Sequence, residues 1–196
     1  MRLPLHAIKL SDHDCNLLND LITKFPKTGI ELLLVASGVK TGDIIEAYEL
    51  DGTKDYFKKV FSQLESKEYL AFQEVGDRII FYNNSIEDDI LERVIKFNEG
   101  MGNDDVAVGI FYGYPLCCCE VFDNNKPIIR KTFTEHFWCS ENCEESQRIA
   151  GLYKEAIQLN APEFMPLLEW FNCLGNNATR YYTLICELIN KVPRIN

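Results

Sequence analysis

Five of the eight cysteines in this chain of 196 residues lie between residues 117 and 143. Three of them, Cys117–Cys119, are adjacent and directly follow a Gly-Tyr-Pro sequence. Two more, Cys139 and Cys143, follow His136 in the sequence HFWCSENC. An even scatter of the cysteines over the chain would place about one of them in this window. The clustering therefore indicates a site that depends on sulfur chemistry.

Both groups of cysteines are expected at the beginning of helices. Pro115 suits the first turn of a helix, which places Cys117 and Cys118 in that same turn. Ser140 is the predicted N-cap of the next helix, with Cys143 in its first turn. The positive end of a helix dipole stabilises a thiolate, which is the form of cysteine that binds metal and attacks electrophiles.

These side chains are of the types that bind metal ions. The predicted ligands are Cys117, Cys118, His136, Cys139 and Cys143. Zinc would favour a closed tetrahedral set, with His136 as the fourth ligand or a neighbour of the ligands, whereas an iron–sulfur cluster would favour cysteines alone. The spacing matches neither a zinc ribbon nor a standard ferredoxin. Because adjacent residues of a helix point about 100° apart, the sequence leaves open which of Cys117 and Cys118 reaches an ion.

Two other interpretations stay open on the sequence. One is a thiol-based redox or nucleophilic enzyme, in which a cysteine of the cluster reacts and His136 supplies a proton. The other is a non-enzymatic interaction module whose cysteines only pack two helix starts together. Whether the protein is an enzyme is therefore open. Cys15, Cys173 and Cys186 lie at helical spacing among apolar residues, and we expect them to be buried structural thiols.

The hydrophobic periodicity predicts the α+β class, mainly helical, with one small antiparallel hairpin or sheet in the N-terminal half. Two alternating runs around Gly76-Asp77 predict a hairpin at 69–84. The helices expected before residue 101 lie at 11–25, ended by 27–29, and at 41–50, 51–66 and 85–100, the last with Ser85 as its N-cap. The run at 30–38 is ambiguous between a buried helix turn and a strand, and Gly38 as a C′ residue favours the helix. The helices expected after it lie at 115–124, 141–160, 162–174 and 176–191.

These elements suggest two lobes packed as one compact protein. Residues 1–100 form an N-terminal lobe that contains the hairpin, and residues 101–196 form a helical lobe that contains the cysteine cluster. The sequence Met101-Gly102-Asn103 has the composition of a hinge between them. We expect the loop before Cys117 to lie against the start of the helix at Glu141.

Composition limits the environment and partners of the protein. The formal net charge is −10, and such a field disfavours general nucleic-acid binding while it is compatible with a protein partner or a homo-oligomer. No apolar run reaches the roughly 18 residues of a membrane span. The N-terminal sequence lacks the apolar stretch of a signal peptide. These features predict a cytoplasmic protein with reduced cysteines and no membrane partner.

The sequence GIFYGYPLCCCEVF, followed by HFWCSENCEES, resembles the signature of an uncharacterised, largely archaeal family, the domain-of-unknown-function family 483. The residues that carry the resemblance are Gly113, Tyr114, Pro115, Cys117, Cys118, Phe122, His136, Cys139, Ser140, Cys143 and Ser146. The chain departs from this pattern at Tyr112, Trp138 and Cys119, where the family has leucine, proline and no extra cysteine. The resemblance implies that Cys119 is the dispensable cysteine of the cluster. It supports the site without assigning an activity.

Overall fold

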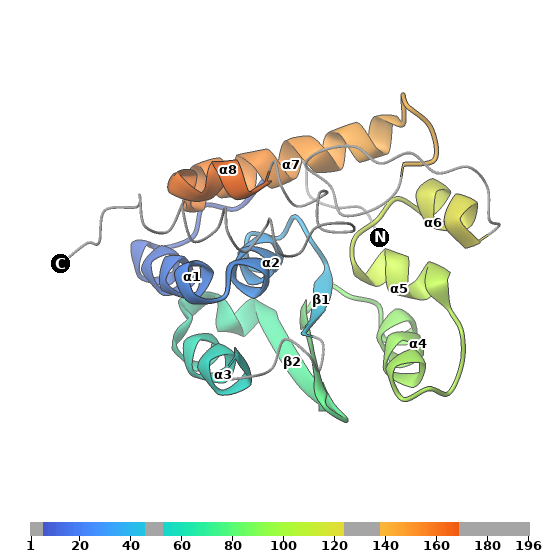
Figure 1. Ribbon diagram of the computed structural model, residues 1–196, viewed down its shortest axis with the longest axis horizontal. Helices are drawn as coiled ribbons and strands as arrows, with labels where there is room; N and C mark the ends of the chain where they lie inside the picture. The colour runs from blue at the N-terminus through green and yellow to red at the C-terminus, as the bar shows by residue number, and fades with distance from the viewer. Residues whose placement is uncertain (1–5, 46–52, 124–137, 169–196) are drawn as a thin grey trace.

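The computed structural model describes residues 6–45, 53–123 and 138–168 (Figure 1). These residues form an α+β structure that is mainly helical, with a small antiparallel sheet in the N-terminal half, as the sequence predicts. The helices are α1 (Asp12–Lys24), α2 (Pro26–Ala36), α3 (Thr53–Gln63), α4 (Asp88–Asn98), α5 (Asp105–Phe111), α6 (Leu116–Asp123), α7 (Glu144–Asn160) and α8 (Met165–Leu168). Short 3₁₀ helices cover Glu65–Tyr69 and Pro162–Phe164, and the strands are β1 (Gly42–Ile45), β2 (Leu70–Val75) and β3 (Arg78–Asn83).

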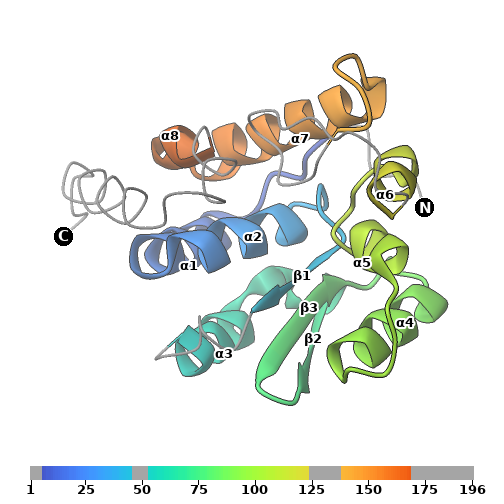
Figure 2. The same ribbon diagram turned by 45° about the vertical axis from the view of Figure 1, so that its right-hand side comes forward.

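The sheet has the order β1-β3-β2, and both pairs of strands are antiparallel. The predicted hairpin is confirmed: Val75 pairs with Arg78 across a turn at Gly76, whose φ of 59° is left-handed and suits glycine. Figure 2 shows α1 and α2 between the sheet and α7, with α3 and α4 at opposite sides of the sheet.

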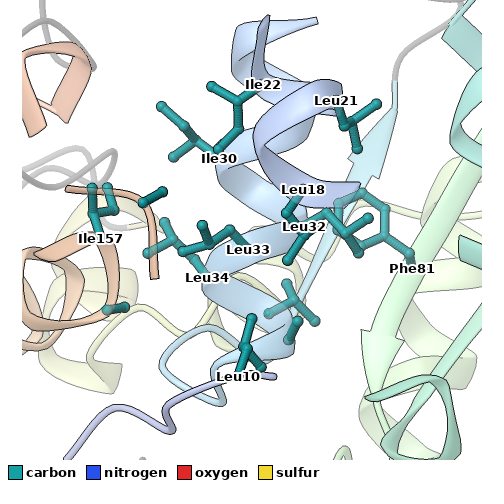
Figure 3. Packing of buried hydrophobic residues seen from close by; sticks show 14 of the residues in the cluster. Leu10, Leu18, Leu21, Ile22, Ile30, Leu32, Leu33, Leu34, Phe81 and Ile157 are labelled. Carbon is teal, nitrogen blue, oxygen red and sulfur yellow. The ribbon is translucent and has the colours of Figure 1, made fainter. Parts of the chain in front are cut away.

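Helix α2 is the centre of the main hydrophobic core. Ile30, Leu32, Leu33 and Leu34 are fully buried, and their side chains leave the helix in several directions (Figure 3). A helix that is apolar on every side must be covered on every side. Helix α1 and the sheet cover α2 on one side, and Ile157 of α7 belongs to the same core.

Two predicted boundaries near α2 are wrong: the end of the first helix at residues 27–29 and the beginning of the next helix at residue 30. Residues 27–29 do not end the first helix, because α1 ends at Lys24 and α2 already begins at Pro26. Proline has no backbone N–H and therefore cannot donate the hydrogen bond that would continue a helix. Its ring also keeps the preceding residue out of the helical region, and Phe25 accordingly has φ and ψ of −136° and 75°. Proline is well suited to the first turn of the helix that follows it.

The helix predicted at 41–50 is also wrong over its described part, where Gly42–Ile45 is strand β1. All four residues of β1 are buried, so the alternation that identifies a half-exposed strand is missing from its sequence. Pairing of β1 with the central strand β3 outweighs any local helical preference. Residues 46–50 lie outside the described residues.

The helix predicted at 85–100 exists, but its beginning differs. Helix α4 begins at Asp88 with Glu87 as the N-cap residue, and Ser85 instead donates its hydroxyl to Asn83. Helix α5 was not predicted; Asp104 caps it by accepting a hydrogen bond from the backbone N–H of Ala107. The segment predicted as a hinge at 101–103 therefore connects two helices that contact each other.

The C-terminal part of the chain is described as far as residue 168. Helix α8 and the preceding 3₁₀ helix lie within the helix predicted at 162–174, and the helix predicted at 176–191 lies outside the described residues, as do Cys173 and Cys186. The two-lobe division stays a prediction, although the main core joins α7 to α1, α2 and the sheet. Within the described ranges, no helix is both long enough and apolar enough to cross a membrane.

Candidate metal centre

The first two cysteines of the cluster lie in the first turn of α6, as predicted. The chain turns at Gly113, where the φ of 79° again requires the left-handed region, and a side chain there would lie against the backbone of Thr41. The carbonyl of Pro115 then accepts the backbone N–H of Cys118 at 2.9 Å. The turn before α6 is thus seated against the loop that leads into β1, which fixes where Cys117 and Cys118 lie.

The other two cysteines precede and cap α7. Ser140 is not the N-cap that the sequence suggests: α7 begins at Glu144, and Cys143 is its N-cap residue. The backbone carbonyl of Ser140 accepts the N–H of Cys143 at 3.4 Å, so the Ser-Glu-Asn-Cys segment forms a turn before the helix. Cys139 lies just before this turn.

Four sulfur atoms meet between the beginnings of α6 and α7. The Sγ atoms of Cys117, Cys118, Cys139 and Cys143 all lie within 4.8 Å of one another. Cys117 is 4.0 Å from Cys118, 3.8 Å from Cys143 and 3.7 Å from Cys139, and Cys118 is 3.8 Å from Cys143. This arrangement could hold a metal ion.

The four cysteines differ in exposure. Cys118 and Cys143 are buried, Cys139 is half-buried and Cys117 is exposed. The buried pair packs with Trp138, which is 6% exposed, in a small apolar cluster of its own. One side of the sulfur group therefore faces the protein and the other faces solvent.

Ser146 is the polar neighbour of the two buried sulfurs. Its side chain is fully buried in the first turn of α7, and its Oγ lies 3.2 Å from the Sγ of both Cys118 and Cys143. The backbone N–H of Cys139 donates to Cys118 Sγ at 3.4 Å. The sequence analysis names Ser146 only as part of the family resemblance and assigns it no contact with the cysteines. Its position three residues after Cys143 could have predicted this contact, since that spacing puts both side chains at the same end of one helix.

These surroundings change the acidity of the metal-free thiols. Burial raises the pKa of Cys118 to about 11, and the neighbouring Cys143 adds to the increase. Burial opposes ionisation of Cys143 as well, but hydrogen bonds from Ser146, Cys139 and Cys118 outweigh it and lower the pKa of Cys143 to about 7. Burial also raises the pKa of Cys117. Of Cys117, Cys118 and Cys143, Cys143 is therefore the thiol that ionises first.

Cys15 and Cys119 do not belong to the group of four sulfurs, and the predicted ligand His136 lies outside the described residues. Cys119 is buried but points away from the other sulfurs: a Cβ built on Gly109 of α5 would lie 2.5 Å from its Sγ. Cys119 therefore packs α6 against α5. Cys15 is a buried thiol in the main core, as predicted, with its Sγ 3.8 Å from the side chain of Asn160.

Comparisons with protein families, curated proteins and solved structures found no relative of this chain. What the fold and the site define is a mainly helical α+β protein with four clustered cysteines at the junction of two helix starts.

Proposed function

We propose that the protein binds one zinc ion through Cys117, Cys118, Cys139 and Cys143, and that this ion has a structural role. The spacing of the sulfurs carries the proposal. With Zn–S bonds of about 2.3 Å, a tetrahedral site has sulfurs about 3.8 Å apart. Four of the six pairs of sulfurs in the cluster are 3.7–4.0 Å apart.

The same spacing favours a single ion over an iron–sulfur cluster. In a [4Fe–4S] cluster each cysteine binds a different iron, and in a [2Fe–2S] cluster two cysteines bind each iron, so in both the width of the cluster keeps some of the four sulfurs apart. Four sulfurs within 4.8 Å of one another leave room for one ion at their centre. Four thiolates also fill a tetrahedral site, which is the property of structural zinc sites, whereas catalytic sites keep a position open for water or substrate.

Such an ion would stabilise a part of the fold that has little core of its own. The buried apolar residues at the site are Cys118, Trp138 and Cys143, a far smaller set than the main core. Zinc would join the first turn of α6, the segment at Cys139 and the N-terminus of α7. Binding free energy of a structural zinc is then free energy of folding for this region.

We further propose that the chain belongs to the largely archaeal family that its signature resembles, and that it is a cytoplasmic protein. Five of the residues that carry the resemblance to the archaeal family, the four cysteines and Ser146, lie together in space, which supports treating them as one signature. A zinc–thiolate site also fits the cytoplasmic location predicted from the sequence, because thiols stay reduced there.

Metal analysis of anaerobically purified protein tests the proposal. We expect one zinc per chain and, after replacement by Co²⁺, the visible absorption of tetrahedral cobalt–thiolate. Cys118→Ala should lose the metal, whereas the matched variant Cys119→Ala, which removes the adjacent buried thiol, should keep it. Because four sulfurs complete the tetrahedron, His136→Ala should also keep it. Less than about a tenth of an equivalent of zinc in the wild type, or iron with sulfide, would contradict a zinc site.

A further inference from the structure

The four sulfurs of the centre fall into two chemically different pairs. Cys118 and Cys143 are buried and lie beside hydrogen-bond donors: Ser146 Oγ is 3.2 Å from each, and the backbone N–H of Cys139 donates to Cys118. Within the described ranges, the only hydrogen-bond partners of Cys117 Sγ are other cysteines. Among the described residues, Cys139 Sγ is likewise hydrogen-bonded only to sulfur, to Cys117 and Cys143.

This difference determines which sulfurs can react once a metal holds all four as thiolates. Hydrogen bonds draw negative charge from a thiolate, and burial keeps solutes away from it. The buried pair is protected in both ways. Cys117 is exposed and Cys139 is half-buried, and among the described residues neither sulfur accepts a hydrogen bond from an oxygen or nitrogen. Reaction with a small electrophile is therefore expected on the Cys117 side.

We propose that the centre is an oxidation site at which a peroxide joins Cys117 to Cys139 and releases the zinc. This rests on the proposed zinc binding and adds a reaction to it. Cys117 Sγ and Cys139 Sγ lie 3.7 Å apart, whereas Cys117–Cys118, Cys117–Cys143 and Cys118–Cys143 are 3.8–4.0 Å apart. A disulfide needs about 2.05 Å, so each sulfur moves by less than about 1 Å.

The reaction balances with one peroxide per zinc. The Cys117 thiolate attacks one oxygen of hydrogen peroxide, the O–O bond breaks and hydroxide leaves, giving a sulfenic acid. The Cys139 thiolate then attacks that sulfur, the S–S bond forms, the S–O bond breaks and a second hydroxide leaves. Two thiolates have lost two electrons, and peroxide has gained them. The zinc keeps only Cys118 and Cys143 as ligands and dissociates.

Other pairings are disfavoured by the same geometry. Cys118 and Cys143 are 3.8 Å apart, but both are buried and pack with Trp138, so a peroxide reaches them less readily than it reaches Cys117. Cys117 and Cys118 are neighbours in the chain and lie 4.0 Å apart. A bond between adjacent residues of a helix would distort the first turn of α6. Cys117 and Cys139 thus combine a short separation with access from solvent, and a disulfide between them needs little movement.

The experiment uses the full chain, purified without oxygen and with its zinc content measured first. Hydrogen peroxide is added in stoichiometric steps while a chromophoric chelator reports free zinc. Remaining thiols are then blocked with iodoacetamide, and the disulfide is located by mass spectrometry. Cleavage after glutamate at Glu141 separates Cys139 from Cys143, and fragment ions separate Cys117 from Cys118.

We expect one zinc released per peroxide, a disulfide between Cys117 and Cys139, and recovery of zinc binding after dithiothreitol and fresh zinc. Cys119→Ser, which leaves all four ligands in place, should behave as the wild type. A different disulfide, or zinc release no faster than in a peroxide-free sample, overturns the oxidation site while zinc binding stands. Absence of zinc at the start overturns both, so the two failures are distinct.

Discussion

Removing the buried charge of Lys40 tests how firmly the base of the cysteine site is held. Lys40 lies between α2 and β1, and its side chain is fully buried. Its ammonium group forms an ion pair with Asp43 of β1, whose side chain is 5% exposed. The ammonium also lies 5.4 Å from the ring centroid of Tyr112, which directly precedes the turn into α6. The Lys40–Asp43 pair therefore lies between strand β1 and the turn that leads into α6.

The expected cost follows from the burial of both partners. Lys40→Met fills a similar volume but leaves the Asp43 carboxylate buried without its cation, which costs about 3–5 kcal/mol. In a chain of this size 1 kcal/mol shifts the melting temperature by roughly 2–4 °C, so the variant should melt roughly 6–20 °C lower. Asp43→Asn in the same chain removes the stranded charge while its side-chain oxygen still accepts the N–H of Ile44. The double variant should therefore be more stable than Lys40→Met alone.

Urea denaturation of the wild type, both single variants and the double variant measures this coupling. Lys96→Met is the control, because Lys96 pairs with Glu92 on the surface of α4, where both side chains are more than half exposed. Loss of such a solvent-screened pair should change the stability little. If Lys40→Met costs no more than this control, or if the two single effects simply add, the buried pair does not stabilise the fold as argued.

Three further predictions concern single side chains. Ser146→Ala removes the hydroxyl beside two of the sulfurs and should weaken zinc binding about 10–100-fold in a chelator competition; an unchanged affinity would exclude this role. Asp14→Ala removes a buried carboxylate that accepts the backbone N–H groups of Glu65 and Ser66, and should cost about 2–3 kcal/mol by urea denaturation, whereas a surface-like cost under about 0.5 kcal/mol would contradict it. In metal-free protein the lowered pKa of Cys143 predicts that its thiolate forms with a midpoint near pH 7, against the ordinary 9.0, as measured by the ultraviolet absorbance of the thiolate against Cys143→Ser. Because the folded state favours the thiolate, this stabilisation is complete above 9.0 and is lost as the pH falls through about 7; a midpoint near 9 would contradict it.

Periodicity predicted the elements that are exposed on one side. The hairpin at 69–84 agrees with β2 and β3 to within a residue or two, and the helix at 51–66 contains α3. In α3, Phe57 and Phe61 recur on one face and are buried, whereas polar residues cover the opposite face. In each case one buried face and one solvated face leave their period in the sequence.

The misassigned elements are those without such a period, or those whose ends depend on geometry. Strand β1 is buried throughout, so its four residues carry no alternation and only pairing with β3 defines it. The beginnings of α4 and α7 were placed at Ser85 and Ser140, the nearest good capping residues in the sequence. The structure uses Glu87 and Cys143 instead, neither with a side-chain cap hydrogen bond. At α7 the sequence prefers a serine cap, but the helix begins where Cys143 joins the other sulfurs.

The cysteine cluster shows why adjacency was ambiguous in the sequence. The 100° between Cys117 and Cys118 suggested that only one of them could reach an ion. Both reach the same point, 4.0 Å apart, because they lie in the first turn of α6 and the other two sulfurs approach beyond the end of the helix. The rotation between the two residues is instead expressed as exposure: Cys118 faces Ser146 and Trp138, and Cys117 faces solvent. The pair of neighbours thus supplies one protected and one reactive sulfur to a single site, and this is the asymmetry on which oxidation by a peroxide would act.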